Sequence, residues 1–553
     1  MHTDTRRFIA RILLFSGLLQ SCHSPQIVGV SEEETTRSVE STDHHDTDAN
    51  PHTLRRRVRS AEPIPETSAG DSTTTPSKSL KLSDVAQIAQ VGNPGCATAV
   101  TSPRIYTGTS FFDDLVLESD VFVDKSLFIK EFLESGDSVS VIARPRLWGK
   151  SLNMDMLRRF LTIQVDKQGR PLPPEESLDR KLFVGGEVVI GSVTGKVKQL
   201  APLKIAEQCS DLISDYQGKY PVISIGLKDV RGSSDQEIQK SVKRQILNLY
   251  SEYLYLKQYM QEDAADFLTN SDKEQLRRYF NGKLRKADIK DSLFFLSKLL
   301  YRHFGKQVYI LIDEYDAPIN NAYLKYTDRS KGFAKILRLF RDLLGSALRD
   351  NPYLKQGLMT GILTIARADL FPDLDNLWDC TLLDEKFITA YGITQQEVDE
   401  LLDKVPSATP ADRIQQWYNG YKLGGHVLYN TWSVMSFLSR KGKLDYYWID
   451  SGGTKLIYSV MGSEEMQQRL KALVSERSIT SSIIHPMCFD DIGKPEGFYS
   501  LLIFAGYLNP EPVTPERNIY RLSIPNQEAR YIYQNRFIKS KSSAENRIDC
   551  RVA

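Results

Sequence analysis

The chain has 553 residues, of which 41% are hydrophobic, so it can form more than one folded domain with a substantial core. Its 71 basic residues nearly balance its 70 acidic residues, which excludes a global basic field of the kind that attracts nucleic acids. The six cysteines are widely spaced and fit neither a zinc pattern nor a disulfide framework.

The start of the chain resembles a secretory signal. Arginines precede an apolar stretch at residues 12–19, which is too short to span a bilayer but suits a signal peptide. Leu19-Gln20-Ser21-Cys22 then resembles a bacterial lipoprotein cleavage box. We therefore expect a signal peptide at residues 1–22 and lipidation at Cys22, which would export the protein or tether it to a membrane. The alternative is an unprocessed start and a cytoplasmic protein.

Residues 23–100 are predicted to be a disordered linker. They are rich in Ser, Thr, acidic residues and His, and large apolar groups are few. His44, His45 and His52 lack closely spaced Cys or carboxylate partners in a folded frame, so a solvated linker is favoured over a metal site.

A phosphate-binding loop is predicted near residue 150. Residues 138–143 have the pattern of a buried strand, and residues 152–161 carry apolar residues at helical spacing. Gly149, Lys150 and Ser151 therefore stand where a strand leads into a helix. The unpaired N–H groups and the dipole at a helix N-terminus favour phosphate, to which Lys150 would add a charge. The Ser151 hydroxyl would bind magnesium.

This loop departs from the standard phosphate-loop motif in one respect. The standard spacing asks for a glycine five positions before Gly149, where this chain has Arg144. The residues predicted to bind the nucleotide are Arg144, Pro145, Arg146, Gly149, Lys150 and Ser151.

The next elements predict alternating strands and helices. Residues 164–215 are expected to be an irregular insertion with a Gly-bounded hairpin. Residues 221–227 have the pattern of a buried strand, and apolar residues from Ile238 to Tyr250 mark one face of a long helix.

Acidic residues follow a second buried strand, predicted at residues 307–312. The carboxyl ends of parallel strands are where such sheets bind ligands, and this strand delivers Asp313 and Glu314 there. We expect Asp313 to hold magnesium and Glu314 to activate the attacking water. The alternative is an acidic cluster that caps the next helix, and Asp316 before Ala317-Pro318 is interpreted as such a cap.

A further strand is predicted at residues 356–363. In ATPases of this general architecture, a polar side chain beside the acidic strand senses the γ-phosphate, which makes Thr360 the sensor candidate. Arg367 is a candidate arginine finger, acting within one chain or from a neighbour in a homo-oligomer. An ion pair with Asp369 or Asp373 is the alternative role for Arg367.

The order of these elements predicts an α/β fold. Over residues 101–390 we expect a P-loop NTPase-type parallel sheet with helices on both faces. Residues 391–530 are expected to form a helical lid and a small winged-helix-like domain. Trp417, Tyr418 and Tyr421 are interpreted as packing residues rather than as a base-stacking platform.

Several segments together resemble the bacterial AAA-ATPase-like domain proteins. They are Phe122–Lys130, Arg144–Ser151, Asp313–Ile319, Thr360–Leu363, Trp417–Tyr421, Tyr429-Asn430, Phe504–Leu508 and Ile524–Asn526. The resemblance implies an ATP-binding domain in which Arg144 is expected, whereas Leu147 stands where the family usually has arginine. Members often carry a C-terminal PD-(D/E)XK nuclease-like domain. Residues 531–553 are instead expected to be a polar tail, so no nuclease activity is predicted.

Two functions are compatible with this pattern. The first is hydrolysis of Mg-ATP coupled to a conformational change, and the second is a nucleotide-binding interaction module without significant turnover. Both require Lys150, but only hydrolysis requires Glu314. The protein partner is not specified by the sequence. An exported ATPase would need a nucleotide-rich destination such as a host cell.

Overall fold

The computed structural model describes residues 103–538, except for 191–194, 262–266, 327–330, 364–368, 372–375, 449–454, 462–463 and 515–517. The predictions for residues 1–22, Cys22, the linker, Arg367 and residues 539–553 lie outside the described residues. No helix in the described ranges is long and apolar enough to cross a membrane.

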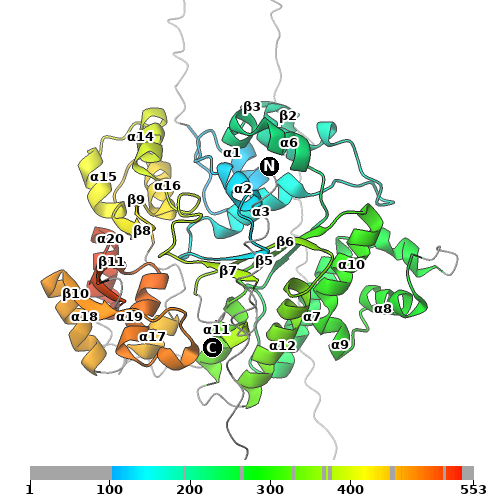
Figure 1. Cartoon of the computed structure of the whole chain (residues 1–553). Helices are drawn as coiled ribbons and strands as arrows, with labels where there is room; N and C mark the ends of the chain where they lie inside the picture. Colours follow the sequence, from blue (N-terminus) through cyan, green and yellow to red (C-terminus); the bar gives the residue numbers. More distant parts are fainter. Residues whose placement is uncertain are drawn as a thin grey trace, which may run out of the picture. The chain divides into compact units, whose positions relative to one another are not determined.

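A parallel sheet lies at the centre of residues 103–390 (Figure 1). Its five strands are β1 (Val139–Ala143), β4 (Val222–Gly226), β5 (Val308–Asp313), β6 (Leu354–Gly361) and β7 (Leu377–Cys380). Their order is β4-β5-β6-β1-β7, and every neighbouring pair is parallel. The predicted α/β fold with a P-loop NTPase-type sheet is confirmed. Because β6 separates β1 from β5, the end of β6 lies between the phosphate loop and the acidic residues.

Helices cover both faces of this sheet, as Figure 1 shows. Alternate residues of β5 enter two separate cores: Tyr309 and Leu311 pack with α3 (Lys150–Leu161), while Ile310 and Ile312 pack on the opposite face. The first core also contains residues of α1 (Phe112–Glu118), α2 (Leu127–Leu133), α4 (Leu178–Val184), α5 (Lys204–Gln208) and α6 (Ser210–Tyr216). The second contains residues of α7 (Asp235–Ser251), α9 (Lys286–Lys290), α10 (Ser292–Phe304), α11 (Ala317–Lys325) and α12 (Lys331–Leu348). Burial on both faces explains why β4 and β5 are largely apolar.

The insertion at residues 164–215 contains the expected hairpin, formed by β2 (Gly186–Ile190) and β3 (Lys196–Leu200). The rest of it is more regular than the sequence pattern predicted. Ser177 caps α4 by accepting a hydrogen bond from the Arg180 N–H, and Leu182 and Phe183 are buried in the first core.

Residues 391–538 form mostly helical structure with two small sheets. The helices are α14 (Gln395–Lys404), α15 (Ala411–Tyr418), α16 (Thr431–Ser439), α17 (Lys455–Val460), α18 (Glu464–Glu476), α19 (Pro495–Phe504) and α20 (Gln527–Ile532). The strands are β8 (Tyr421–Leu423) and β9 (His426–Leu428), which form a hairpin, and β10 (Ser478–Ser482), β11 (Asn509–Thr514) and β12 (Ile519–Ser523), which form an antiparallel sheet.

Two observations bear on the predictions for this region. Tyr418 and Tyr421 are buried, and the Trp417 ring lies 4.9 Å from that of Tyr446, so these aromatic residues serve packing. The chain also continues beyond residue 530 through a π-helical turn, Tyr533–Phe537, in which both of these aromatic residues are buried. Described structure thus continues past residue 530 to residue 538.

Candidate functional site

The loop between β1 and α3 has the backbone that an anion site needs. Gly149 has φ 83°, a left-handed conformation that favours glycine, and it directly precedes α3. No side chain caps this helix end. The first N–H groups of α3 are therefore available to a bound anion.

Lys150 is folded back across this loop. Its Nζ donates to the carbonyl oxygens of Arg144 (2.9 Å) and Pro145 (2.8 Å), and the residue is only 6% exposed. Burial lowers the pKa of Lys150 to about 8, although the nearby carboxylates of Asp313 and Glu314 oppose this shift. A bound phosphate would therefore have to replace the two carbonyl oxygens as the partner of Nζ.

The Asp313 carboxylate is hydrogen-bonded to two other predicted site residues. Its Oδ2 accepts a hydrogen bond from the Ser151 hydroxyl (2.5 Å), and its Oδ1 accepts one from the Thr360 hydroxyl. The fold thus brings together the predicted metal ligands, Ser151 and Asp313, and the predicted sensor. A hydroxyl and a carboxylate are suitable ligands for a magnesium ion that keeps water and phosphate oxygens as its other ligands. The described residues contain no group of three or more His, Cys, Asp and Glu suited to hold a metal without such help.

Glu314 follows Asp313 in an uncommon backbone conformation. Its φ is 50°, which is unfavourable for a residue with a side chain, and such strain is concentrated at functional sites. Its N–H donates to Asp313 Oδ1 (3.0 Å), and the residue lines the cavity described below. The position is suitable for a group that polarises a water molecule.

Arg144 has a structural role, so its predicted role as a nucleotide ligand is corrected. The residue is fully buried, and its guanidinium donates to the carbonyl oxygens of Ala143 (2.9 Å), Cys380 (2.7 Å), Thr381 (2.9 Å) and Lys386 (3.2 Å). It therefore joins the end of β1 to the segment after β7 and does not line the cavity.

Pro145 is directed toward the C-terminal region instead of the cavity. A Cβ at Gly506 would lie 2.6 Å from the Pro145 Cγ, so only glycine allows this close approach. In contrast, Arg146 lines the cavity together with Gly149, Lys150 and Ser151. Their role as nucleotide ligands stays a prediction.

Asp316 does not cap α11, contrary to the interpretation from sequence. Its carboxylate accepts hydrogen bonds from the backbone N–H groups of Ile362 (3.1 Å) and Leu363 (3.0 Å) and from the Asn320 side chain (2.9 Å). Burial raises the pKa of Asp316 to about 6. The residue is structural, as expected, but it holds the end of β6.

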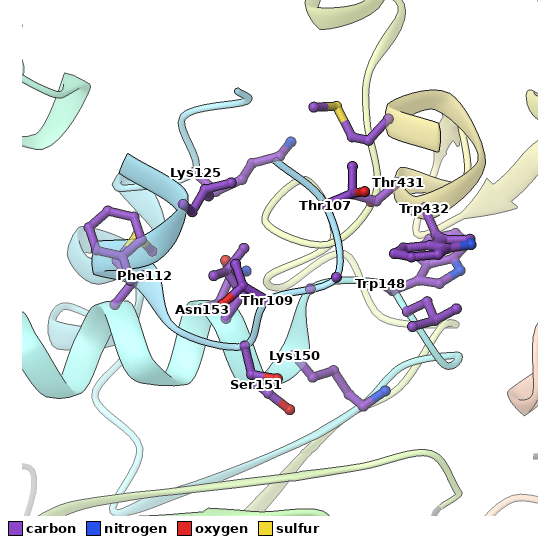
Figure 2. A pocket seen from close by; sticks show the side chains of 18 of the residues that line it. Thr107, Thr109, Phe112, Lys125, Trp148, Lys150, Ser151, Asn153, Thr431 and Trp432 are labelled. Carbon is purple, nitrogen blue, oxygen red and sulfur yellow. The ribbon is translucent and has the colours of Figure 1, made fainter. Parts of the chain in front are cut away.

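A cavity of about 280 Å³ adjoins the loop (Figure 2). Three segments far apart in the sequence line it: residues 106–110, the start of α3, and α16. Its apolar wall includes Phe112, Leu115, Met156, Trp432 and Met435, and its polar groups include Thr107, Thr109, Asn153 and Thr431. Apolar walls with a few polar groups are typical of small-molecule sites.

Most of these wall residues were missed from sequence. Residues 106–110 and α16 carry no motif chemistry of their own, and only the fold brings them to the loop. Two quoted segments gave a signal. Phe122, Val123 and Lys125 of Phe122–Lys130 line the cavity, and Tyr429-Asn430 stands directly before α16. Asn430 caps that helix by accepting a hydrogen bond from the Ser433 N–H (3.1 Å).

Comparison with known proteins agrees with this geometry. Residues 106–171 and 201–371 match the family described as "Predicted AAA-ATPase". We refer to residues 106–371, which contain both matched segments, as the AAA-ATPase-like domain. Residues 172–200 of this domain are not matched. They contain α4 and the β2–β3 hairpin, so these elements of the insertion lie outside the matched segments. This match supports a general ATPase or nucleotide-binding role.

One curated relative extends beyond the AAA-ATPase-like domain. An uncharacterized protein in the vnfD 5' region of Azotobacter chroococcum mcd 1 is 23% identical over 414 residues. The match covers 74% of this chain and 64% of the relative, so the chain spans less than two thirds of the relative's length.

Proposed function

We propose that the AAA-ATPase-like domain binds Mg-ATP between the phosphate loop and α16 and hydrolyses it. The observation that carries this proposal is the hydrogen-bonded cluster of Ser151, Asp313 and Thr360 beside the uncapped start of α3. The phosphates would lie at the helix N-terminus with Lys150, and the nucleoside would occupy the apolar cavity.

In this proposal each polar residue has a separate role. Ser151 and Asp313 would hold magnesium, which when bound neutralises phosphate charge. Thr360 would report the terminal phosphate through its hydrogen bond to Asp313. Glu314 would act as the general base that accepts a proton from the attacking water, since it is the acidic residue at the cavity wall.

Contacts between the phosphate loop and the C-terminal region support coupling of hydrolysis to a conformational change. The Trp448 indole N–H donates to the Arg146 carbonyl oxygen (3.0 Å), and the Trp148 ring packs edge-on against Tyr421 at 5.0 Å. To bind phosphate, Lys150 would leave the carbonyl oxygens of Arg144 and Pro145. These residues belong to the same loop as Arg146, which Trp448 contacts.

Glu314→Gln tests hydrolysis. Binding of Mg-ATP should persist, while turnover falls by about 10²-fold or more, because the amide cannot activate water. Titration calorimetry and a phosphate-release assay on the full chain measure the two quantities, and Lys150→Ala, which should abolish binding, is the control. Wild-type binding without turnover would favour the nucleotide-binding interaction module. Binding that survives in Lys150→Ala would refute the phosphate-loop assignment.

A further inference from the structure

Lys228 lies at the acidic edge of the sheet, immediately after β4. The strand ends at Gly226, which is the register partner of Asp313, and the Leu227 N–H donates to the Asp313 carbonyl oxygen (2.9 Å). The Leu227 side chain is buried in the core on the face opposite α3. Lys228 follows in a turn just beyond the strand end.

Lys228 also belongs to the wall of the cavity. It lines that cavity together with Lys150, Ser151 and Glu314. Gly226 leaves this side of the strand end open, since a Cβ there would meet no heavy atom within 4 Å.

The charge of Lys228 is not neutralised within the described part of the chain. The residue is exposed, and it forms no hydrogen bond or ion pair with any other described residue. Asp313 and Glu314 nevertheless lie at the end of the neighbouring strand. An exposed lysine is often only a solvated charge. Here, however, it faces a site where two carboxylates would repel an anion, and a second cation would offset that repulsion.

We propose that Lys228 contacts the terminal phosphate of ATP and positions it for attack beside Glu314. This inference rests on the proposed function. Lys150, at the start of α3, would bind the phosphates that ATP and ADP share. Lys228 lies on the side of Glu314, where the terminal phosphate of ATP would lie and where ADP has no phosphate. Lys228 therefore distinguishes ATP from ADP and stabilises the charge of the phosphate under attack.

Lys228→Ala tests this assignment, with Lys228→Arg as the conservative variant and Lys240→Ala as the matched control. Lys240 is exposed on α7 and does not line the cavity. Dissociation constants for Mg-ATP and Mg-ADP and the turnover rate are measured for the full chain, and melting temperatures check the fold. Lys228→Ala should weaken Mg-ATP binding roughly tenfold and reduce turnover by a similar factor, with Mg-ADP binding unchanged. Lys228→Arg should retain most of both, and Lys240→Ala should equal the wild type.

The outcomes separate this inference from the function on which it rests. Unchanged ATP-to-ADP preference and turnover in Lys228→Ala, in a protein that binds and hydrolyses ATP, would overturn the role of Lys228 alone. Equal losses for ATP and ADP would also overturn it, because they would indicate a general effect on the site. A wild type that binds neither nucleotide would overturn the proposed function, and the role of Lys228 with it.

Discussion

At the scale of single residues, Lys150 shows how burial prepares a charged group for its ligand. Burial disfavours the ammonium form and lowers the pKa of Lys150 to about 8. Two backbone carbonyl oxygens are the hydrogen-bond partners of its Nζ. A phosphate anion would favour the ammonium form strongly, so ligand binding and proton binding at Lys150 are linked.

This linkage predicts that Mg-ATP binding takes up protons at pH 8. The pKa of Lys150 is about 8 without ligand, and the anion should raise it, so affinity should fall as pH increases above 8. Calorimetry in two buffers with different ionisation enthalpies measures the uptake. Lys150→Arg cannot titrate in this range and should show less uptake than the wild type. Identical uptake in the two proteins would assign the proton to another group.

At the scale of elements, two arginines of one loop have different functions. Arg144 supplies donors to carbonyl oxygens at the ends of β1 and β7, which would otherwise be buried without partners. Arg146, two positions later, lines the cavity.

We expect Arg144→Met to destabilise the fold and Arg146→Met to weaken ligand binding. Removing the Arg144 guanidinium leaves several buried carbonyl oxygens unsatisfied, which should lower the free energy of unfolding by about 3 kcal/mol. Arg146→Met should unfold like the wild type but bind Mg-ATP less tightly. Urea denaturation and calorimetry on both variants provide the comparison. Wild-type stability in Arg144→Met would contradict the structural role of the guanidinium.

At the scale of the whole described unit, a buried carboxyl group links the phosphate loop to the C-terminal helices. Glu528 of α20 accepts hydrogen bonds from the Trp448 N–H (2.8 Å) and the Ser433 hydroxyl (2.6 Å), and the Trp448 indole reaches Arg146. Burial raises the pKa of Glu528 to about 7. The protonated group is therefore stable in the folded state at pH values where the unfolded chain releases its proton.

The sign of this shift predicts a loss of stability with increasing pH. Between the ordinary pKa of 4.5 and about 7, the folded state binds more protons at Glu528 than the unfolded state does. The free energy of unfolding should therefore fall across this window, by roughly 3 kcal/mol from this group. Glu528→Gln should lack this component, and Glu476→Gln, at an exposed position of α18, should retain it. Urea denaturation at pH 5 and pH 8 measures the difference. If the free energy of unfolding changed equally with pH in the wild type and in Glu528→Gln, Glu528 would not be the group responsible.

Sequence reasoning located the chemical groups of the site better than its walls. Asp313 could be found because it ends a buried strand, and Lys150 and Ser151 because they begin the helix after another. The carboxyl ends of parallel strands meet at one edge of the sheet. Thr360 could be placed on the same reasoning. Residues 106–110 and α16 could not, since nothing in their local pattern indicates which distant segment they contact.

The sequence by itself determined the strands, the loop and the helices, because these depend on residue periodicity and on glycine at one left-handed position. The tertiary structure alone decided which charged residue meets which partner. Arg144 and Arg146 are the same residue type in the same loop, yet the packing of β7 beside β1 surrounds the first with carbonyl oxygens and leaves the second at the cavity. Asp316 likewise satisfies backbone N–H groups after β6, more than 40 residues away along the chain. Such partners are set by long-range strand order, which local sequence patterns do not encode.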